Sequence, residues 1–266
     1  MHVLNRPEGP IAYDLYGEEG PLIVCLPGMG DVRATFRHLA PELAAAGFRV
    51  AALDLRGHGD SGTAFTDYTP QAAADDAAAL IRELGGPALV LGVSVGGTAA
   101  AWLAATRPEL VSGIVLVGAF LRGDGMGLVK RTAFQAMFLR PWGPAAVVSY
   151  LSSLFTGRTA DDHAEHLAAI RAHLRPRDRY RAILATVANA FRPVPARLDD
   201  VRAPALVVMG EGDPDWPDPA AEAAWMTERL GATLLMVPEA GHFPHAQRAD
   251  VVAPAVAAFA RETARA

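Results

Sequence analysis

Ser94 lies at the centre of the stretch GVSVG, residues 92–96, which follows an apolar run and opens an alanine-rich helical pattern. This G-x-S-x-G pattern is typical of a serine on a sharp turn between a strand and a helix, where the two glycines leave room for a strained backbone. The helix that begins there directs backbone N–H groups and the positive end of its dipole at developing negative charge. The pattern therefore predicts Ser94 as a nucleophile that attacks a carbonyl carbon.

Three histidines are candidates for the base that would activate this serine. His242 comes shortly after the apolar run TLLMV, and His245 stands three residues later, behind a proline. His58 lies in the glycine-rich loop DLRGHGDSG, residues 54–62, which fits a structured turn better than a catalytic loop. Because a loop at the carboxyl end of a strand points over the sheet, where ligands bind, we favour His242 and keep His245 as its competitor.

Four carboxylates are crowded into the stretch EGDPDWPDP, residues 211–219, directly after the apolar run ALVVM. They fit a metal loop, a solvated turn, or the acid that orients a catalytic histidine. The stretch lacks the glycine and the bidentate glutamate of a calcium loop, and prolines stiffen it, so a metal site is disfavoured. Glu211 and Asp218 fit a solvated turn. Asp213 and Asp215 remain as candidates for the catalytic acid.

A second glycine-rich turn, LPGMGD at residues 26–31, follows an early apolar run. Acyl transfer needs two N–H donors for the negatively charged oxygen of its intermediate, and a loop next to the nucleophile turn can supply one of them. We therefore expect the backbone N–H groups of Met29 and Val95 to form the oxyanion hole.

Short apolar runs recur along the chain, each followed by a turn and most of them then by a helical pattern. They span residues 21–26, 48–54, 87–93, 113–119, 205–209 and 233–237. Runs this uniformly apolar are typical of strands covered on both faces. The chain is therefore predicted to form an α/β fold with a mostly parallel sheet and crossover helices.

The alternation of strands and helices is interrupted once, after residue 120. About 85 residues without a convincing strand follow, too many for a structureless loop in a compact domain. We predict that residues 121–200 form an inserted helical cap, and that residues 1–120 and 201–266 form the core domain. The insert carries several aromatic residues that fit either the pocket lining or the cap's own interior: Phe134, Phe138, Trp142 and Phe155.

Charge is distributed unevenly between the cap and the rest of the chain. The predicted cap contains 12 Lys and Arg against 7 Asp and Glu, whereas the whole chain has a formal net charge of −5. The run Arg177, Arg179 and Arg181 raises the hypothesis of an anionic substrate, although charge runs usually face water. The negative total argues against nucleic-acid binding, since proteins that track phosphates carry a basic excess.

Composition and the termini of the chain narrow the setting further. With 51% hydrophobic residues among 266, the chain can bury a sizeable core. No apolar stretch approaches the roughly 18 residues needed to span a bilayer, and the N-terminal residues show no signal-peptide pattern. We therefore expect a cytoplasmic protein without a membrane partner. The single Cys25 sits in an apolar run and fits a buried hydrophobic position.

Five motifs, in this order and spacing, resemble the α/β-hydrolase superfamily: PGMG, DLRGHGDS, GVSVGG, GEGD and AGH. The resemblance covers essentially the whole chain. It implies an eight-stranded, mostly parallel sheet with helices on both faces, a helical cap, and a Ser-Asp-His triad that needs no metal and no organic cofactor. The position of the acid in that family favours Asp213 over Asp215, so the implied triad is Ser94, Asp213 and His242. Relatives with dehalogenase or epoxide hydrolase chemistry have aspartate where this chain has Ser94.

The resemblance leaves the substrate open, because the cap matches no known specificity signature. The usual His-Gly before the oxyanion residue is also replaced by Pro27-Gly28. Hydrolysis of a carboxylic ester, thioester or lactone of a small to medium metabolite through an acyl-enzyme is the first hypothesis. Cleavage of a C–C bond, or acyl transfer to an alcohol, would use the same triad. A ligand sensor that retains the triad but turns over slowly is the hypothesis from a different class.

Overall fold

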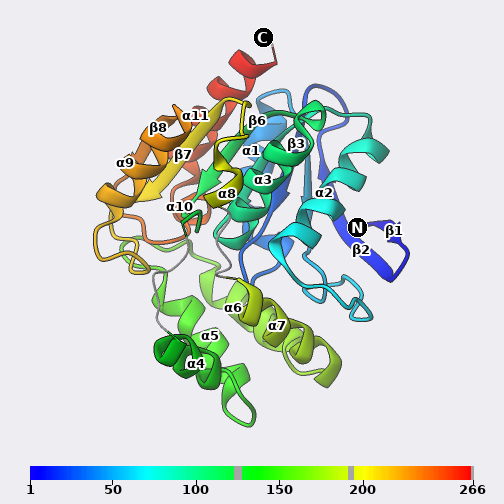
Figure 1. Ribbon diagram of the computed structural model, residues 1–266, viewed down its shortest axis with the longest axis vertical. Coiled ribbons are helices and arrows are strands. Elements are labelled where there is room, and N and C mark those ends of the chain that lie inside the picture. The colour runs from blue at the N-terminus through cyan, green and yellow to red at the C-terminus, as the bar shows by residue number, and fades with distance from the viewer. Residues whose placement is uncertain (123–127, 191–194, 265–266) are drawn as a thin grey trace.

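The computed structural model describes residues 1–122, 128–190 and 195–264 of the chain (Figure 1). Its centre is one eight-stranded sheet with the strand order β1-β2-β4-β3-β5-β6-β7-β8. The strands are β1 (His2–Arg6), β2 (Gly9–Tyr16), β3 (Leu22–Leu26), β4 (Arg49–Leu53), β5 (Ala88–Val93), β6 (Val111–Val117), β7 (Ala205–Gly210) and β8 (Thr233–Val237). From β4 to β8 along the sheet all neighbours are parallel, while β2 pairs antiparallel with both β1 and β4. The prediction of an eight-stranded, mostly parallel sheet is confirmed.

Helices cover both faces of this sheet, as its buried strands require. One hydrophobic cluster joins inward side chains such as Ile23 and Cys25 to α1 (Leu39–Ala45) and α11 (Ala249–Thr263). The alternate side chains of the same strands pack with helices on the other face: α2 (Pro70–Leu84), α3 (Val95–Thr106) and α9 (Pro219–Leu230). Strands such as β3 and β5 are buried at every residue. That burial explains their continuous apolar sequences.

Among the described residues, four of the five helices between β6 and β7 lie together, and we call these four the cap helices. They are α4 (Leu128–Met137), α5 (Gly143–Ser153), α6 (His163–His173) and α7 (Arg177–Asn189). Figure 1 shows them together at one end of the molecule, away from the helices that flank the sheet. The short α8 (Pro195–Leu198) instead contacts α3, and Leu198 is buried in the cluster on that face. We therefore propose that the core resumes before residue 200.

Polar contacts hold the cap helices against the core. Nε2 of His166, on α6, lies 2.9 Å from Oδ1 of Asp31, and both side chains are buried. At the start of α6, Asp162 pairs with the guanidinium of Arg37 at 2.6 Å. These contacts place α6 next to the loop that follows β3.

Within the described residues, no helix is both long enough and apolar enough to cross a membrane.

Candidate active site

Ser94 occupies the turn between β5 and α3 in a backbone conformation that few residues with a Cβ adopt. Its φ is 53° and its ψ is −117°. The turn is held by the Ser94 N–H, which donates to the carbonyl of Val117 at 2.8 Å. A Cβ at Gly92 would collide with the carbonyl of Gly96, and a Cβ at Gly96 would collide with the carbonyl of Leu26. Both glycines of the pattern are therefore needed for the chain to pass so close to itself.

Replacing Gly96 by alanine is expected to destabilise the protein by about 3 kcal/mol, because the added methyl group meets backbone rather than a flexible side chain. Urea unfolding followed by circular dichroism measures this loss. A free energy of unfolding equal to that of the unchanged protein would contradict the close packing of the turn against β3.

His242 and Asp213 meet in the loops that follow β8 and β7. Nδ1 of His242 donates to Oδ2 of Asp213 at 2.7 Å, and both side chains are almost completely buried. The other oxygen of Asp213 accepts the backbone N–H of Asp215 at 3.0 Å. Gly118, at the end of β6, gives the imidazole its space: a Cβ there would lie 2.9 Å from the ring. The sequence analysis did not single out Gly118.

The electrostatic environment of His242 favours its protonated form. Burial alone would lower its pKa, but the carboxylates of Asp213 and Asp215 outweigh burial and raise the pKa of His242 to about 9. Nε2 of the ring is buried and has no hydrogen-bond partner among the residues described in the structure. His242 and Ser94 line the same cavity.

His245, the competitor of His242, pairs with Thr35. Its Nε2 is 2.9 Å from Oγ1 of Thr35, and burial lowers its pKa to about 3. A neutral histidine that bonds a threonine in the core fits a structural role. His242 is therefore the histidine that the structure brings to Asp213.

The cavity beside Ser94 is small and mostly apolar. It is lined by Gly28, Met29, Ser94, Val95, Phe120, Tyr150, Leu151, Leu154, His242 and Phe243. About 10 Å³ is open to the centre of a water molecule, so a substrate must move side chains to enter. Met29 and Val95 thus flank the serine, and no hydrogen bond within the described residues uses the backbone N–H of either one. Both groups are free to bind an oxyanion.

The cap contributes Tyr150, Leu151 and Leu154 to this lining, from α5 and the residue after it. None of the four aromatic candidates of the cap is among the lining residues. Phe134 and Phe138 pack edge to face at 5.0 Å inside the cap, and Trp142 is 60% exposed. No feature of its sequence distinguishes α5 from the other cap helices as the helix next to Ser94.

His58 stabilises the loop that carries Met29. Nδ1 of the buried ring lies 2.8 Å from the carbonyl of Arg56, to which it donates, so Nε2 accepts the backbone N–H of Gly30 at 3.1 Å. Burial lowers the pKa of His58, which keeps the ring neutral and Nε2 able to accept. The prediction that residues 54–62 form a structured turn agrees with these contacts, which also tie this turn to the loop that carries Met29.

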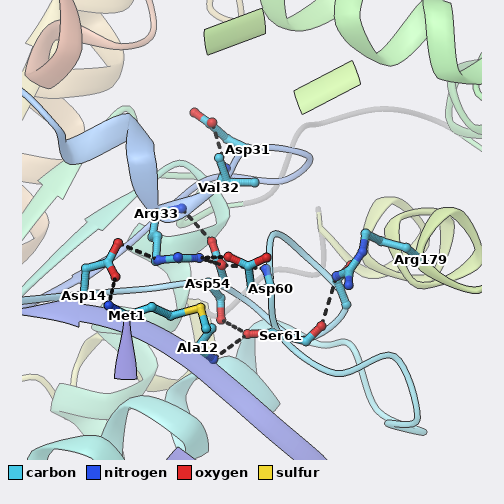
Figure 2. A network of polar contacts seen from close by, with 11 residues as sticks. Met1, Ala12, Asp14, Asp31, Val32, Arg33, Asp54, Asp60, Ser61 and Arg179 are labelled. Carbon is cyan, nitrogen blue, oxygen red and sulfur yellow. Dashed lines mark hydrogen bonds and ion pairs between the residues drawn. The ribbon is translucent and has the colours of Figure 1, made fainter. Parts of the chain in front are cut away.

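Figure 2 shows ion pairs and hydrogen bonds that link the loop at residues 54–62 to the sheet and to cap helix α7. The Arg33 guanidinium contacts Asp14 at 2.7 Å and Asp60 at 2.8 Å, and it also pairs with the fully buried Asp54. From α7, Arg179 donates to the carbonyl of Ser61 at 3.0 Å. This arginine of the basic run is therefore used in holding the loop.

Replacing His58 by leucine is expected to lower kcat about 10-fold to 100-fold with a smaller change in KM, since Gly30 loses its acceptor and the oxyanion loop shifts. His58→Gln, whose amide can accept from Gly30 and donate to Arg56, should recover part of this loss. Steady-state kinetics with one activated ester measure both variants. Equal kcat values for the leucine variant and the unchanged protein would refute the positioning role.

A metal ion needs several ligand atoms close together. Among the described residues such a group is formed by Asp213, Asp215 and His242, whose possible ligand atoms lie within 4.8 Å of one another. Most of these atoms already have partners, because Asp213 bonds Nδ1 of His242 and Asp215 accepts from Tyr150 at 3.0 Å. The described polar contacts of these side chains are therefore among the three residues and with Tyr150.

Known proteins resemble this chain in sequence and in fold. Residues 23–255 match the model of the alpha/beta hydrolase family. The chain is 32% identical over 251 residues to a pimeloyl-(acyl-carrier protein) methyl ester esterase of Aromatoleum aromaticum, covering 84% of this chain and 92% of the relative. It is 29% identical over 254 residues to a 2-(acetamidomethylene)succinate hydrolase of Mesorhizobium japonicum, covering 90% and 88%. A thermophilic esterase from Thermogutta terrifontis has a similar fold, with a TM-score of 0.81, 24% identity and coverage of 96% and 94%. The chain belongs to the α/β-hydrolase family.

Proposed function

We propose that this protein is a serine hydrolase that cleaves a carboxylic ester, thioester or lactone of a small to medium metabolite through an acyl-enzyme. The observation that carries the proposal is the 2.7 Å hydrogen bond between His242 and Asp213, with His242 and the strained Ser94 lining one cavity. The relatives that hydrolyse a methyl ester and a succinate derivative support the reaction class.

The proposed mechanism follows from the roles of these groups. Oγ of Ser94 attacks the carbonyl carbon while Nε2 of His242 takes its proton, and Asp213 stabilises the resulting imidazolium. The N–H groups of Met29 and Val95 bind the oxyanion of the tetrahedral intermediate. The imidazolium then protonates the leaving group. Water, activated by the same histidine, releases the acid and restores Ser94.

The lining of the cavity disfavours an anionic acyl group. It includes neither lysine nor arginine among the described residues, and Met29, Phe120 and Leu154 present apolar surface. Arg179 bonds the loop carbonyls, and Arg177 and Arg181 are exposed. We therefore propose that any anionic part of the substrate lies outside this cavity.

A fluorophosphonate label followed by peptide mass mapping tests the proposal, with esters, thioesters and lactones assayed in parallel. Modification of Ser94 and steady turnover of at least one substrate class are the expected results. Labelling of another residue would overturn the assignment of the nucleophile. A burst of product without turnover would favour the slow sensor.

A further inference from the structure

Asp215 has no role in the proposed mechanism, yet its side chain faces the reactive nitrogen of the catalytic histidine. Oδ2 of Asp215 lies 3.6 Å from Nε2 of His242. The ring is therefore placed between two carboxylates, with Asp213 on Nδ1 and Asp215 beside Nε2. Nε2 is also the atom that must take the proton from Ser94.

Tyr150, on cap helix α5, fixes the position of the Asp215 carboxylate. Its hydroxyl lies 3.0 Å from Oδ1 and 3.2 Å from Oδ2 of Asp215, and it donates to this group. The Tyr150 ring is held in turn by edge-to-face contacts with Phe134 at 5.6 Å and Phe138 at 5.8 Å. The carboxylate is therefore positioned by the cap as well as by its own loop.

Few hydrogen-bond donors surround the carboxylate of Asp215. Its side chain is only 14% exposed, and among the described residues the Tyr150 hydroxyl is its one hydrogen-bond donor. An ionised carboxylate offers about four acceptor sites, and leaving them unfilled in a buried place is unfavourable. A donor on a bound ligand would fill such a site.

We propose that Asp215 is a specificity-determining residue that binds a hydrogen-bond donor of the substrate, a hydroxyl or ammonium group on the carbon next to the scissile carbonyl. The inference rests on the proposed function, because it takes Ser94 and His242 as the reacting groups. In the absence of such a substrate, Asp215 stabilises the imidazolium form of His242 and so competes with Ser94 for Nε2. A substrate donor that binds Asp215 removes this competition.

The same arrangement determines how activity depends on pH. The groups that face the imidazole are Asp213 and Asp215 from the loop after β7, with Tyr150 from the cap behind Asp215 and the neutral His245 nearby. The pKa of Asp215 is raised above its ordinary value, mainly by burial and also by the neighbouring Asp213. His242 and Tyr150 act in the opposite direction and only partly offset this rise. His242 must be neutral to accept a proton from Ser94, so kcat/KM should rise with pH up to the pKa of His242, about 9.

Two ethyl esters of similar size test the proposal: 2-hydroxybutanoate, which carries a donor, and 2-fluorobutanoate, which carries none and whose fluorine withdraws electrons more strongly. The unchanged protein should prefer the hydroxy ester by about 10-fold to 100-fold in kcat/KM. Asp215→Asn and Tyr150→Phe should each reduce this ratio, the first by about 10-fold or more. Glu211→Gln is the matched control, since it removes an exposed carboxylate from the same loop and should leave the ratio unchanged.

The pKa of His242, measured by NMR of the ¹⁵N-labelled imidazole, gives a readout that does not depend on turnover. It should fall by about one unit or more in Asp215→Asn, because one of the two facing carboxylates becomes neutral, and stay the same in Glu211→Gln. Thermal melting shows whether each variant is folded.

The outcomes separate this inference from the proposed function. Fluorophosphonate labelling of Ser94 together with an unaltered ester ratio and an unaltered His242 pKa in Asp215→Asn would overturn the role of Asp215 alone. Labelling of a residue other than Ser94 would overturn the proposed function, and with it the inference that rests on it. Labelling of Ser94, a lower ester ratio and a lower pKa in Asp215→Asn would together support the inference.

Discussion

Replacing Ser94 by alanine is expected to lower kcat on an activated ester by about a million-fold, to the level left by the oxyanion groups and binding alone. The effect is large because the three side chains act as a unit: without Oγ, the proton acceptor His242 and its partner Asp213 have no nucleophile to activate. Progress curves at high enzyme concentration measure the residual rate, and the fluorophosphonate label should no longer bind covalently.

Ser149→Ala is the control for this experiment. Ser149 is an exposed serine on α5, close to the lining residue Tyr150 in sequence, so its loss should leave kcat unchanged. The alanine variant at position 94 removes one oxygen and fits the same turn, so both variants should melt near the temperature of the unchanged protein. Retention of more than a tenth of the activity by Ser94→Ala would show that another group attacks the substrate.

The central strands could be predicted from sequence, whereas the first two could not. Strands β3 to β7 appear as apolar runs because they lie inside the sheet and are covered by helices. The edge strand β8 is apolar in sequence although only Val237 in it is buried. In β1 (His2–Arg6) only Leu4 is buried, and β2 ends in half-buried residues. This antiparallel pair at the edge follows from the family resemblance, since its own residues give no continuous apolar signal.

The position of the serine and the histidine followed from local patterns, because each stands at the end of a strand in a glycine-rich turn. The choice between Asp213 and Asp215 did not. Both lie in the same proline-stiffened loop, and both carboxylates reach the imidazole, from opposite nitrogens. The carboxylate of Asp215 is hydrogen-bonded to Tyr150, which is 65 residues away in sequence, and such a contact leaves no trace in local spacing.

The cap illustrates the same limit. Its helical character follows from periodicity, but the face that each helix turns to Ser94 depends on packing between segments far apart in sequence. Tyr150 and Leu151 line the cavity. Phe138 is also an aromatic residue of the cap, but it is buried and does not line the cavity. Spacing alone does not distinguish these positions. The sequence likewise indicated a structural role for His58. Its hydrogen bond with the N–H of Gly30 could be seen only in the folded structure.

Replacing Asp213 by asparagine is expected to lower kcat by about 10,000-fold while the protein stays folded. The amide nitrogen of asparagine donates, so it favours the histidine tautomer whose Nδ1 accepts and whose Nε2 carries the proton. A protonated Nε2 cannot take the proton of Ser94. Asp215 adds to the effect, because its carboxylate lies 3.6 Å from Nε2 and stabilises a proton there. Stopped-flow and steady-state rates on one ester measure the loss.

Asp215→Asn provides the comparison that decides between the two acids. On an ester that carries no donor group, this variant should keep kcat within about 10-fold of the unchanged protein, because the bond between His242 and Asp213 remains. At neutral pH its kcat/KM should even increase, since the lower pKa of His242 leaves more of the ring neutral. The reverse pattern, a near-normal Asp213→Asn and an inactive Asp215→Asn, would make Asp215 the acid of the triad and Asp213 its structural neighbour.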